Sequence, residues 1–261
     1  WKRMIVLAAG ATMNLIVGFI FTLIIMAQSS GFVSNTVSGF AENAASQASG
    51  LQAGDEILKV NGTHVFTSKD ISFAILTSEK NSFDFKVRRN GEKTELKNIE
   101  FEKVEKEDGT KAIKIDFKLD KIPKSFFTVI KEAFLDMIST IQITWLSLIG
   151  IITGKFSLKE VTGPVGMVSM IGTATSKGLE VSLLAGINNM ISVVALIALN
   201  LGIMNLMPLP ALDGGRIVFA LFEQLTGKKI SEKYEGIIHT IGFILLIGLI
   251  LFITFNDIMG L

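Results

Sequence analysis

Long stretches without charged side chains dominate the pattern of this chain. Residues 4–27 and residues 182–207 contain no ionisable side chain, and residues 236–256 contain only His239. A helix of 24 residues is about 36 Å long, which exceeds the roughly 30 Å hydrocarbon thickness of a bilayer. The pattern therefore predicts three membrane-spanning helices surrounded by a lipid bilayer.

A fourth apolar stretch, residues 125–154, has two interpretations. Lys131, Glu132 and Asp136 interrupt its first half, so it predicts either a short span or a helix at the membrane interface. Lys and Arg concentrate in cytoplasmic loops. An interfacial helix gives that side six (Lys2, Arg3, Arg216, Lys228, Lys229, Lys233), and a span gives it five (Lys2, Arg3, Lys155, Lys159, Lys177). The count slightly favours the interfacial helix, and both arrangements start the first span in the cytoplasm.

The charged residues gather in the middle of the chain and predict a small mixed domain there. Residues 31–120 hold 28 of the 49 charged residues. Residues 55–60 approach the alternation of a half-buried strand, and residues 83–87 alternate with period two. Asn61-Gly62 is the strongest short hairpin signal, and Asn90-Gly91 predicts a second hairpin. Residues 69–76 carry apolar side chains at the spacing of a short amphipathic helix. Since Lys2 and Arg3 are cytoplasmic, this domain is expected outside.

This middle segment resembles a PDZ domain over about residues 32–120. The resemblance rests on the order of strand, helix and hairpin and on residues 48–62, Ala-Ser-Gly-Leu-Gln-Ala-Gly-Asp-Glu-Ile-Leu-Lys-Val-Asn-Gly. A PDZ domain binds an extended peptide along a sheet edge beside a helix. The resemblance implies a groove between residues 33–37 and 69–76, lined by Val33, Val37, Ile71 and Ile75. The family's carboxylate-binding loop has only Ser38-Gly39-Phe40 as a counterpart, so a cap without a peptide ligand is the alternative.

Composition narrows the class of protein. The chain is 49% hydrophobic and 19% charged, with a mean hydropathy of +0.52, which excludes a disordered chain and argues against an ordinary soluble domain. Its 25 basic and 24 acidic residues nearly cancel, so nucleic acid is not an expected partner. There is no cysteine, so any metal must be held by His, Asp or Glu.

The sharpest motif runs from Asn205 to Gly215 in the order Asn-x-x-Pro-x-Pro-x-Leu-Asp-Gly-Gly. Pro208 and Pro210 each remove a backbone donor, and a broken helix is costly in lipid unless protein or water surrounds it. Asp213 follows, near the start of a helix predicted from residue 217 to 225. A carboxylate at membrane depth is a functional-site hypothesis. The alternative is a surface helix cap at Asp213, with the glycines forming its turn.

Three motifs together resemble the site-2 protease family of intramembrane zinc metalloproteases, most closely its PDZ-bearing bacterial branch of the regulator of sigma-E protease type. Residues 9–14 are similar to the family's Ala-Gly-Pro-x-x-Asn, with Ala11 replacing the proline. Residues 148–158 and 162–166 are similar to the stretch before its third membrane helix, and residues 205–215 to its Leu-Asp-Gly segment. The resemblance covers nearly the whole chain.

This resemblance implies a multi-pass α-helical membrane protein with an inserted α+β PDZ-like domain. Residues 1–30 would be the family's second membrane helix, and residues 31–120 the extracytoplasmic PDZ-like domain. Residues 121–181 would be an amphipathic, interfacial helical region. Residues 182–261 would form two membrane helices with the Asn-x-x-Pro-x-Pro-x-Leu-Asp-Gly segment between them.

The resemblance also implies the chemistry. Zn²⁺ would be held by Asp213 and by two histidines of a His-Glu-x-x-His helix, whose Glu acts as general base. Asn205 would join Asp213 in the catalytic site, and Asn205, Pro208, Pro210 and Asn14 would hold the substrate extended. For Asn14, an interhelical hydrogen bond is an equal alternative. Substrates would be single-span proteins of the bacterial cytoplasmic membrane, such as anti-sigma factors or remnant signal peptides.

The His-Glu-x-x-His helix is absent from these residues. The histidines are His64, expected in a turn, and His239, expected to pack against helices or a polar partner. Catalytic zinc needs three protein ligands, and the chain offers Asp213, so it should be inactive alone. An N-terminal truncation explains this better than loss of the site, because residue 1 matches the start of the family's second helix. The alternatives are a noncatalytic membrane scaffold that binds protein tails and, behind it, a transporter, for which no inverted repeat is evident.

Overall fold

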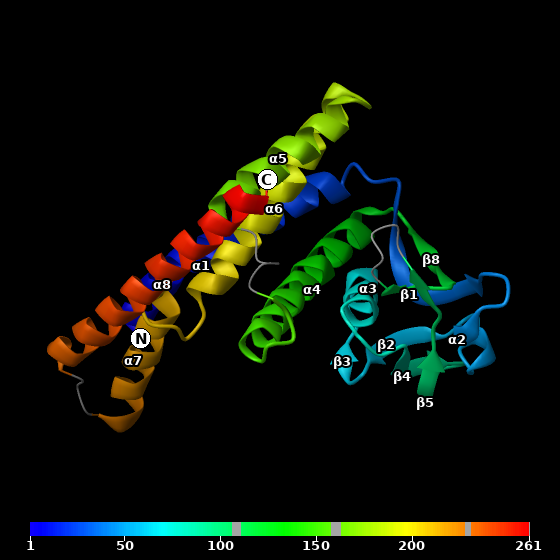
Figure 1. The fold of residues 1–261 in the computed structure, drawn as a ribbon, viewed down its shortest axis with the longest axis horizontal. Helices are drawn as coiled ribbons and strands as arrows, with labels where there is room; N and C mark the ends of the chain where they lie inside the picture. Colours follow the sequence, from blue (N-terminus) through cyan, green and yellow to red (C-terminus); the bar gives the residue numbers. More distant parts are fainter. Residues whose placement is uncertain (106–110, 158–162, 228–230, 261) are drawn as a thin grey trace. The chain divides into compact units, whose positions relative to one another are not determined.

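The computed structural model describes residues 1–105, 111–157, 163–227 and 231–260 (Figure 1). It divides into two compact units, Trp1–Ile25 with Thr140–Leu261 and Met26–Ser139, and the division cuts two helices, one after residue 25 and one after residue 139. Each unit is described by itself. The similarity at residues 158 and 162, and Lys159, Lys228 and Lys229 of the loop count, lie outside the described residues.

The first unit is helical. Its helices are α1 (Lys2–Met26), α5 (Pro164–Leu179), α6 (Leu183–Asn205), α7 (Asp213–Thr226) and α8 (Glu232–Gly260), with the second half of α4 (Phe126–Ile152). Within the described ranges, α1, α4, α6 and α8 are long and apolar enough to cross a membrane. This confirms the prediction of a membrane protein. For α4, length and composition support a span, the interpretation that the lysine count favoured less.

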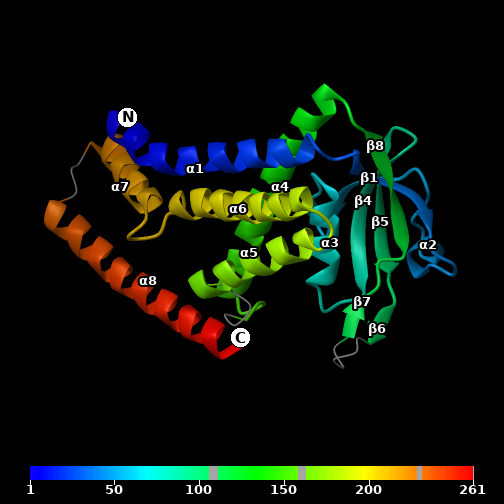
Figure 2. The ribbon, with the colours of Figure 1, turned by 90° about the horizontal axis from the view of Figure 1, so that it is seen from above.

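Close approach between α1 and α6 depends on glycine. A Cβ atom on Gly18 would lie 2.6 Å from Leu199 Cγ, and one on Gly202 would lie 2.8 Å from Leu15. Because the residue numbers rise on one helix as they fall on the other, the two helices run antiparallel (Figure 2). Lipid supplies little hydrophobic drive for helix association, so small residues that let backbones touch are the usual solution.

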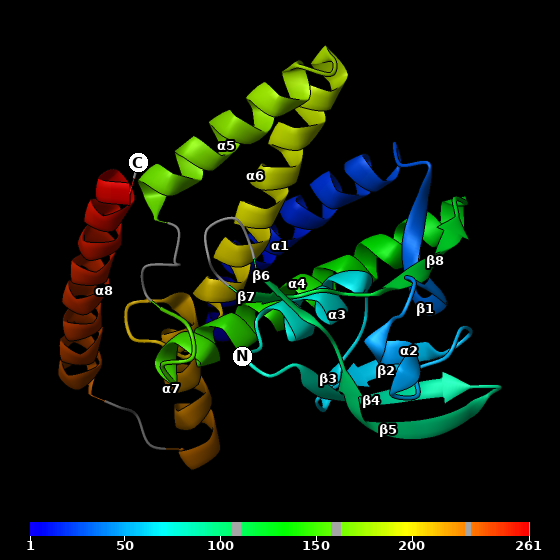
Figure 3. The ribbon, with the colours of Figure 1, turned by 45° about the vertical axis from the view of Figure 1, so that its right-hand side comes forward.

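The helices α5 and α6 form a tight hairpin (Figure 3). A Cβ on Gly178 would lie 2.6 Å from the Ala185 carbonyl oxygen. At the other end of α5, the Asp257 carboxylate of α8 accepts hydrogen bonds from Gly166 N at 2.8 Å and Gly163 N at 3.3 Å. These amides lie at the start of α5, where they have no hydrogen-bond partner within the helix. A carboxylate is favoured there because the N-terminal end of a helix is positive.

The second unit is built on an antiparallel sheet. Its elements are β1 (Gly31–Phe40), α2 (Ala45–Ala48), β2 (Glu56–Val60), β3 (Thr63–His64), α3 (Ser68–Leu76), β4 (Ser82–Arg89), β5 (Glu92–Glu100), β6 (Lys103–Glu105), β7 (Lys111–Ile113) and β8 (Phe117–Pro123). One antiparallel sheet has the order β5-β4-β2-β1-β8, with β3 paired to β2, and β6 pairs with β7. The predicted α+β segment is therefore a folded sheet domain, and its resemblance to PDZ stays a prediction.

The predicted hairpins and helix are present. Asn61 (φ 48°) and Gly62 (φ 81°) connect β2 to β3, and Asn90 (φ 51°) and Gly91 (φ 87°) connect β4 to β5. Positive φ at both positions is what a tight two-residue hairpin requires, and Asn and Gly tolerate it best. The helix α3 starts at a capping box, in which Thr67 accepts from Lys69 N while Asp70 accepts from Thr67 N.

Aromatic and aliphatic side chains fill the core of this domain. Phe83, Phe85 and Phe101 are at most 2% exposed, and Phe83 meets Phe101 edge to face with ring centroids 5.6 Å apart. Next to this core, Asp55 is fully buried and paired with Arg89 through two hydrogen bonds of 2.7 Å. The hydrogen bond to Asp55 raises the pKa of Arg89 above its ordinary value. The pair fixes the β2–β4 side of the sheet.

The prediction of the peptide groove is wrong about the strand that borders it, residues 33–37 of β1. An added strand needs a free sheet edge, but β1 lies between β2 and β8, and the edge strands of this sheet are β5 and β8. Val37, Ile71 and Ile75 are at most 1% exposed and belong to the core. Among the four predicted lining residues, Val33 is the exposed one, at 50%. Burial in the domain core therefore explains the apolar side chains of Val37, Ile71 and Ile75.

Polar side chains in the first half of α4 contact the helix α3 of this unit. Lys69 of α3 pairs with Asp136. Ser139 donates to Asp70 at 2.9 Å and accepts from Thr67 at 3.1 Å, so α4 joins the capping box of α3. Asp136 and Ser139 are both buried. Asp136, one of the three charges that made the sequence ambiguous here, is therefore a partner of α3 in the sheet domain.

Candidate active site

The helix α6 ends where the two prolines begin. At the end of α6, Met207 N donates a hydrogen bond to Met204 O at 3.0 Å. Beyond it, Leu209 N donates to Met207 O at 2.7 Å. Pro208 and Pro210 have no N–H to continue the helix. The chain resumes helical geometry at Asp213, the first residue of α7. The predicted break is present, and α7 starts four residues earlier than residue 217.

Two glycines let α7 begin directly against the end of α6. A Cβ on Gly214 would lie 2.2 Å from Met207 O, and one on Gly215 would lie 2.3 Å from Leu209 O. Neither position has room for a side chain, because the obstacle is backbone. The glycines after Asp213 are thus needed for packing, and they bring the start of α7 to the broken segment.

Asp213 has a free carboxylate. It is partly exposed, and within the described residues it has no hydrogen-bond or ion-pair partner. No side chain caps α7, since Leu212 occupies the N-cap position. The alternative of Asp213 as the helix cap is therefore not what the structure has.

The two predicted asparagines also have free side chains. Asn205 is the last residue of α6, and Asn14 lies on α1 beside Leu15, which packs against Gly202 of α6. Both are partly exposed, and neither side chain has a hydrogen-bond partner among the residues described. The interhelical hydrogen bond considered for Asn14 is absent from that set.

His239 plays a larger part here than its sequence position suggested. Its Nδ1 accepts a 2.9 Å hydrogen bond from Ala211 N, and its ring lies edge-on to Phe219 with centroids 5.6 Å apart. His239 was expected to pack against helices or a polar partner, and the structure shows both: Phe219 of α7 and, as the polar partner, the turn before Asp213. The clue in the sequence was a lone histidine in an apolar span. His64 lies in β3, beside the predicted turn.

This segment has one side chain that can bind zinc. A carboxylate oxygen is an ordinary zinc ligand, and the free Asp213 side chain supplies one. Over the described ranges, no three His, Asp or Glu side chains come together as a metal site. The described residues of this segment therefore offer zinc one donor, Asp213.

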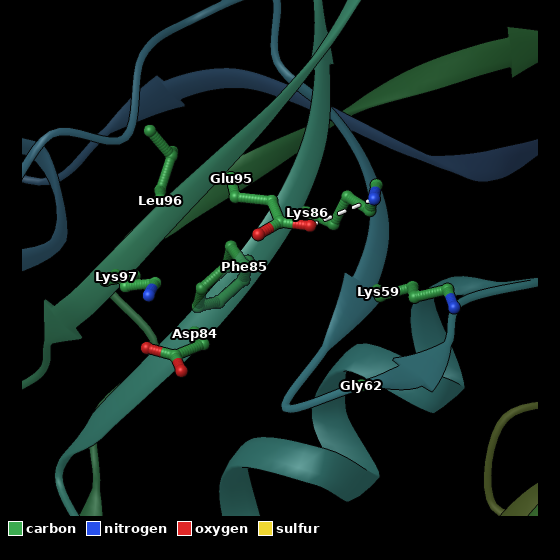
Figure 4. Close-up of a pocket in the computed structure, with 8 residues that line it drawn as sticks. All are labelled: Lys59, Gly62, Asp84, Phe85, Lys86, Glu95, Leu96 and Lys97. Atoms are coloured by element: carbon green, nitrogen blue, oxygen red, sulfur yellow. Dashed lines mark hydrogen bonds and ion pairs between the residues drawn. The ribbon is translucent and has the colours of Figure 1, made fainter.

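A pocket of about 240 Å³ lies on the sheet domain (Figure 4). The pocket is lined by Lys59, Gly62, Asp84, Phe85, Lys86, Glu95, Leu96 and Lys97. Charges of both signs surround it, and Lys86 pairs with Glu95 at 3.0 Å. This contact lowers the pKa of Glu95 below its ordinary value. The mixed charges select no particular ligand.

Apolar helices of membrane-spanning length, with a free carboxylate beside a helix break, define an integral membrane protein with a candidate intramembrane site. Comparison with known proteins gives the family. The model of peptidase family M50 matches residues 1–249. The chain therefore belongs to peptidase family M50, the site-2 proteases, which confirms the resemblance and the prediction of a metalloprotease.

Similar curated proteins agree. The chain is 33% identical over 98% of its length to "Putative zinc metalloprotease CPE1693" of Clostridium perfringens, covering 73% of that protein. It is 35% identical to "Zinc metalloprotease RasP" of Shouchella clausii and 32% identical to "Probable protease eep" of Enterococcus faecalis, over 98% of this chain and 59% of each relative. Zinc in the first two of these names agrees with the predicted cofactor.

Proposed function

We propose that this chain contributes the substrate-binding and third-ligand part of an intramembrane zinc endopeptidase. The protease would cleave membrane spans of single-span proteins, for which anti-sigma factors and remnant signal peptides are the candidate classes. The observation that carries the proposal is the free Asp213 carboxylate at the first turn of α7, directly after the double-proline break. Membership of family M50 supports the same activity.

The remaining zinc donors are proposed to come from a His-Glu-x-x-His helix outside these residues. His239 cannot replace it, because its Nδ1 already accepts a backbone hydrogen bond. Bound zinc would polarise the peptide carbonyl and activate water. In that arrangement Asp213 contributes one oxygen ligand and a negative charge.

Asn205 is proposed to bind the substrate backbone. A helical peptide bond is engaged in its own hydrogen bonds, so it must be unwound before cleavage, and lipid offers no replacement partners. An asparagine amide both donates and accepts, which matches the two backbone groups that an extended segment exposes. The free side chain of Asn205, at the start of the broken segment, supports this role, and Asn14 is proposed to assist.

The sheet domain is proposed to regulate substrate entry. An extended protein segment can pair with an edge strand, and β8 is an edge that leads directly into α4. The charged surface of the domain suits an aqueous compartment, which the Lys2 and Arg3 argument assigns to the outside of a bacterial cytoplasmic membrane. A gate that acts by size, without peptide binding, is the other form of this proposal.

Asp213→Asn in the full-length protease tests the central claim. The neutral side chain should reduce cleavage of a single-span reporter by at least about 100-fold, because a metal ligand is weakened, and should reduce bound zinc. Asp257→Asn is the matched control, since it alters another carboxylate of the same unit that holds α5 rather than metal. Equal zinc content and turnover in Asp213→Asn and wild type would defeat the proposal.

Asn205→Ala tests substrate positioning. It should lower turnover of a helical substrate while bound zinc stays unchanged, because the amide is assigned to the peptide rather than to the metal. The control is Asn189→Ala on the same helix, where the amide donates to Ala174 O and serves packing. A loss of zinc in Asn205→Ala would contradict this assignment.

A further inference from the structure

The helix α8 holds the turn before Asp213 at two points. His239 Nδ1 accepts from Ala211 N at 2.9 Å. One turn along α8, a Cβ on Gly242 would lie 2.4 Å from Pro210 Cβ, so the helix backbone lies directly against the proline. Positions 239 and 242 lie three apart and share one helix face. Two consecutive turn residues are thus fixed by the same face of α8.

Ala211 is the strained residue of this turn. Its φ is +77°, in the left-handed region that a residue with a side chain rarely adopts. Pro210 before it has no N–H, and Leu212 after it donates at a long 3.3 Å to Leu209 O. The hydrogen bond to His239 is therefore the strong polar contact at the strained residue. A conformation of this kind persists when its surroundings hold it in place.

The state of the other ring nitrogen indicates that His239 does more than fill space between the helices. Because Nδ1 accepts a hydrogen, the ring proton is on Nε2. Nε2 is buried and has no hydrogen-bond partner within the described residues. A buried unpaired donor disfavours folding, so an apolar side chain of similar size would pack at least as well. The protonated Nε2 also has no lone pair for a metal.

We propose that His239 is a positioning residue for Asp213, an inference that rests on the function proposed above. By accepting the Ala211 amide hydrogen, His239 holds the left-handed turn two residues before the metal-binding carboxylate. Without this bond, Ala211 relaxes toward negative φ, and the start of α7 rotates away from the position in which Asp213 meets zinc. The residue acts through the turn and touches neither metal nor substrate.

Four variants of the full-length protease test this role. His239→Leu removes the acceptor, and His239→Gln places its amide one atom too far along the side chain. His239→Asn restores an acceptor oxygen at the position of Nδ1. The double variant His239→Leu/Ala211→Gly removes the acceptor but also the strain, since glycine adopts positive φ freely. Thr240→Leu on the same helix is the control, because its hydroxyl bonds within its own turn to Gly236 O.

Zinc affinity is measured by competition with a chromophoric chelator in the absence of substrate. His239→Leu and His239→Gln should each weaken zinc binding on the order of 10- to 100-fold, as loss of a supporting contact behind a metal ligand does. His239→Asn and the double variant should recover most of that loss, and Thr240→Leu should bind zinc like wild type. Wild-type affinity in His239→Leu overturns the proposal.

The rescue separates positioning from packing. If His239→Asn and the double variant bind zinc no better than His239→Leu, the imidazole acts through its volume, and the proposal is overturned. If His239→Leu does not fold, the comparison of His239→Asn with His239→Gln decides, since both are polar and differ in where the acceptor lies. The Asp213→Asn variant is measured alongside. Should it retain zinc, the proposed function fails, whereas zinc lost in Asp213→Asn but kept in His239→Leu defeats the positioning role alone.

Discussion

The sheet domain and the helical unit place their large and small residues in opposite ways. In the sheet domain, Phe83, Phe85 and Phe101 are at most 2% exposed. In the helical unit, Phe243 and Leu251 of α8 are 57% and 64% exposed, while Gly18 and Gly202 lie between helices. In water, large apolar side chains are most stable when buried. In lipid they can stay on the surface, and close contact between helix backbones stabilises the packing instead. The same substitution should therefore have different consequences in the two units.

The largest expected difference comes from removing a phenyl ring. Phe101→Ala should destabilise the sheet domain by about 3–5 kcal/mol, because it deletes a buried ring and leaves a cavity. Phe243→Ala on α8 should change stability by less than about 0.5 kcal/mol, as exposed substitutions usually do. Hydrogen exchange of the intact chain measures the first, and denaturation in mixed micelles the second. Similar losses at both positions would contradict the comparison.

Breaking the buried ion pair should destabilise the sheet domain slightly less than Phe101→Ala does. Arg89→Met leaves the fully buried Asp55 without its partner, and such a loss destabilises by about 3 kcal/mol or more. Faster amide exchange in β2 and β4 should report it. Arg88→Met is the control, because that side chain is 43% exposed and pairs with Glu56 at the surface. If the two variants exchange alike, the buried pair does not fix the sheet.

Adding a single methyl group should distinguish a close helix contact from an open helix face. Gly202→Ala places a Cβ 2.8 Å from Leu15 and 3.0 Å from Ala11 O, so α1 and α6 must move apart, at about 1–3 kcal/mol. Gly248→Ala on α8 meets nothing within 4 Å and should be neutral or slightly stabilising. Denaturation in mixed micelles followed by circular dichroism compares them. Gly202→Ala with wild-type stability would show that this contact can adapt.

The smallest expected effect is a pH dependence at the sheet surface. Lys86 lowers the pKa of Glu95, so this contact stabilises the folded domain above the unfolded pKa of Glu95, and the stabilisation is lost as pH falls through the lowered folded pKa. Glu95→Gln should remove that dependence, and high salt should mask it in the parent chain. Amide exchange of β4 and β5 across the acid range is the measurement. A pH profile unaltered by the substitution would contradict this account.

Local patterns predicted much of the fold. The apolar stretches gave α1, α6 and α8, and the two Asn-Gly pairs gave turns with positive φ at both residues. The peptide groove could not be predicted in the same way, because period-two apolar positions report burial and do not reveal which strand lies at an edge. The polar start of α4 was ambiguous for a related reason, since its partners Lys69 and Asp70 are far away in sequence.

For the candidate site, the sequence by itself determined the broken helix, the glycines after it and the carboxylate of Asp213, since prolines lack donors and glycines lack Cβ atoms wherever they occur. Tertiary structure decided that Gly214 meets the backbone of Met207, that Asp213 has no partner among the described residues, and that His239 holds Ala211. Chain chemistry is local and can be read residue by residue. Which helix faces which turn depends on packing between residues 28 positions apart, and that information appears only when the chain is folded.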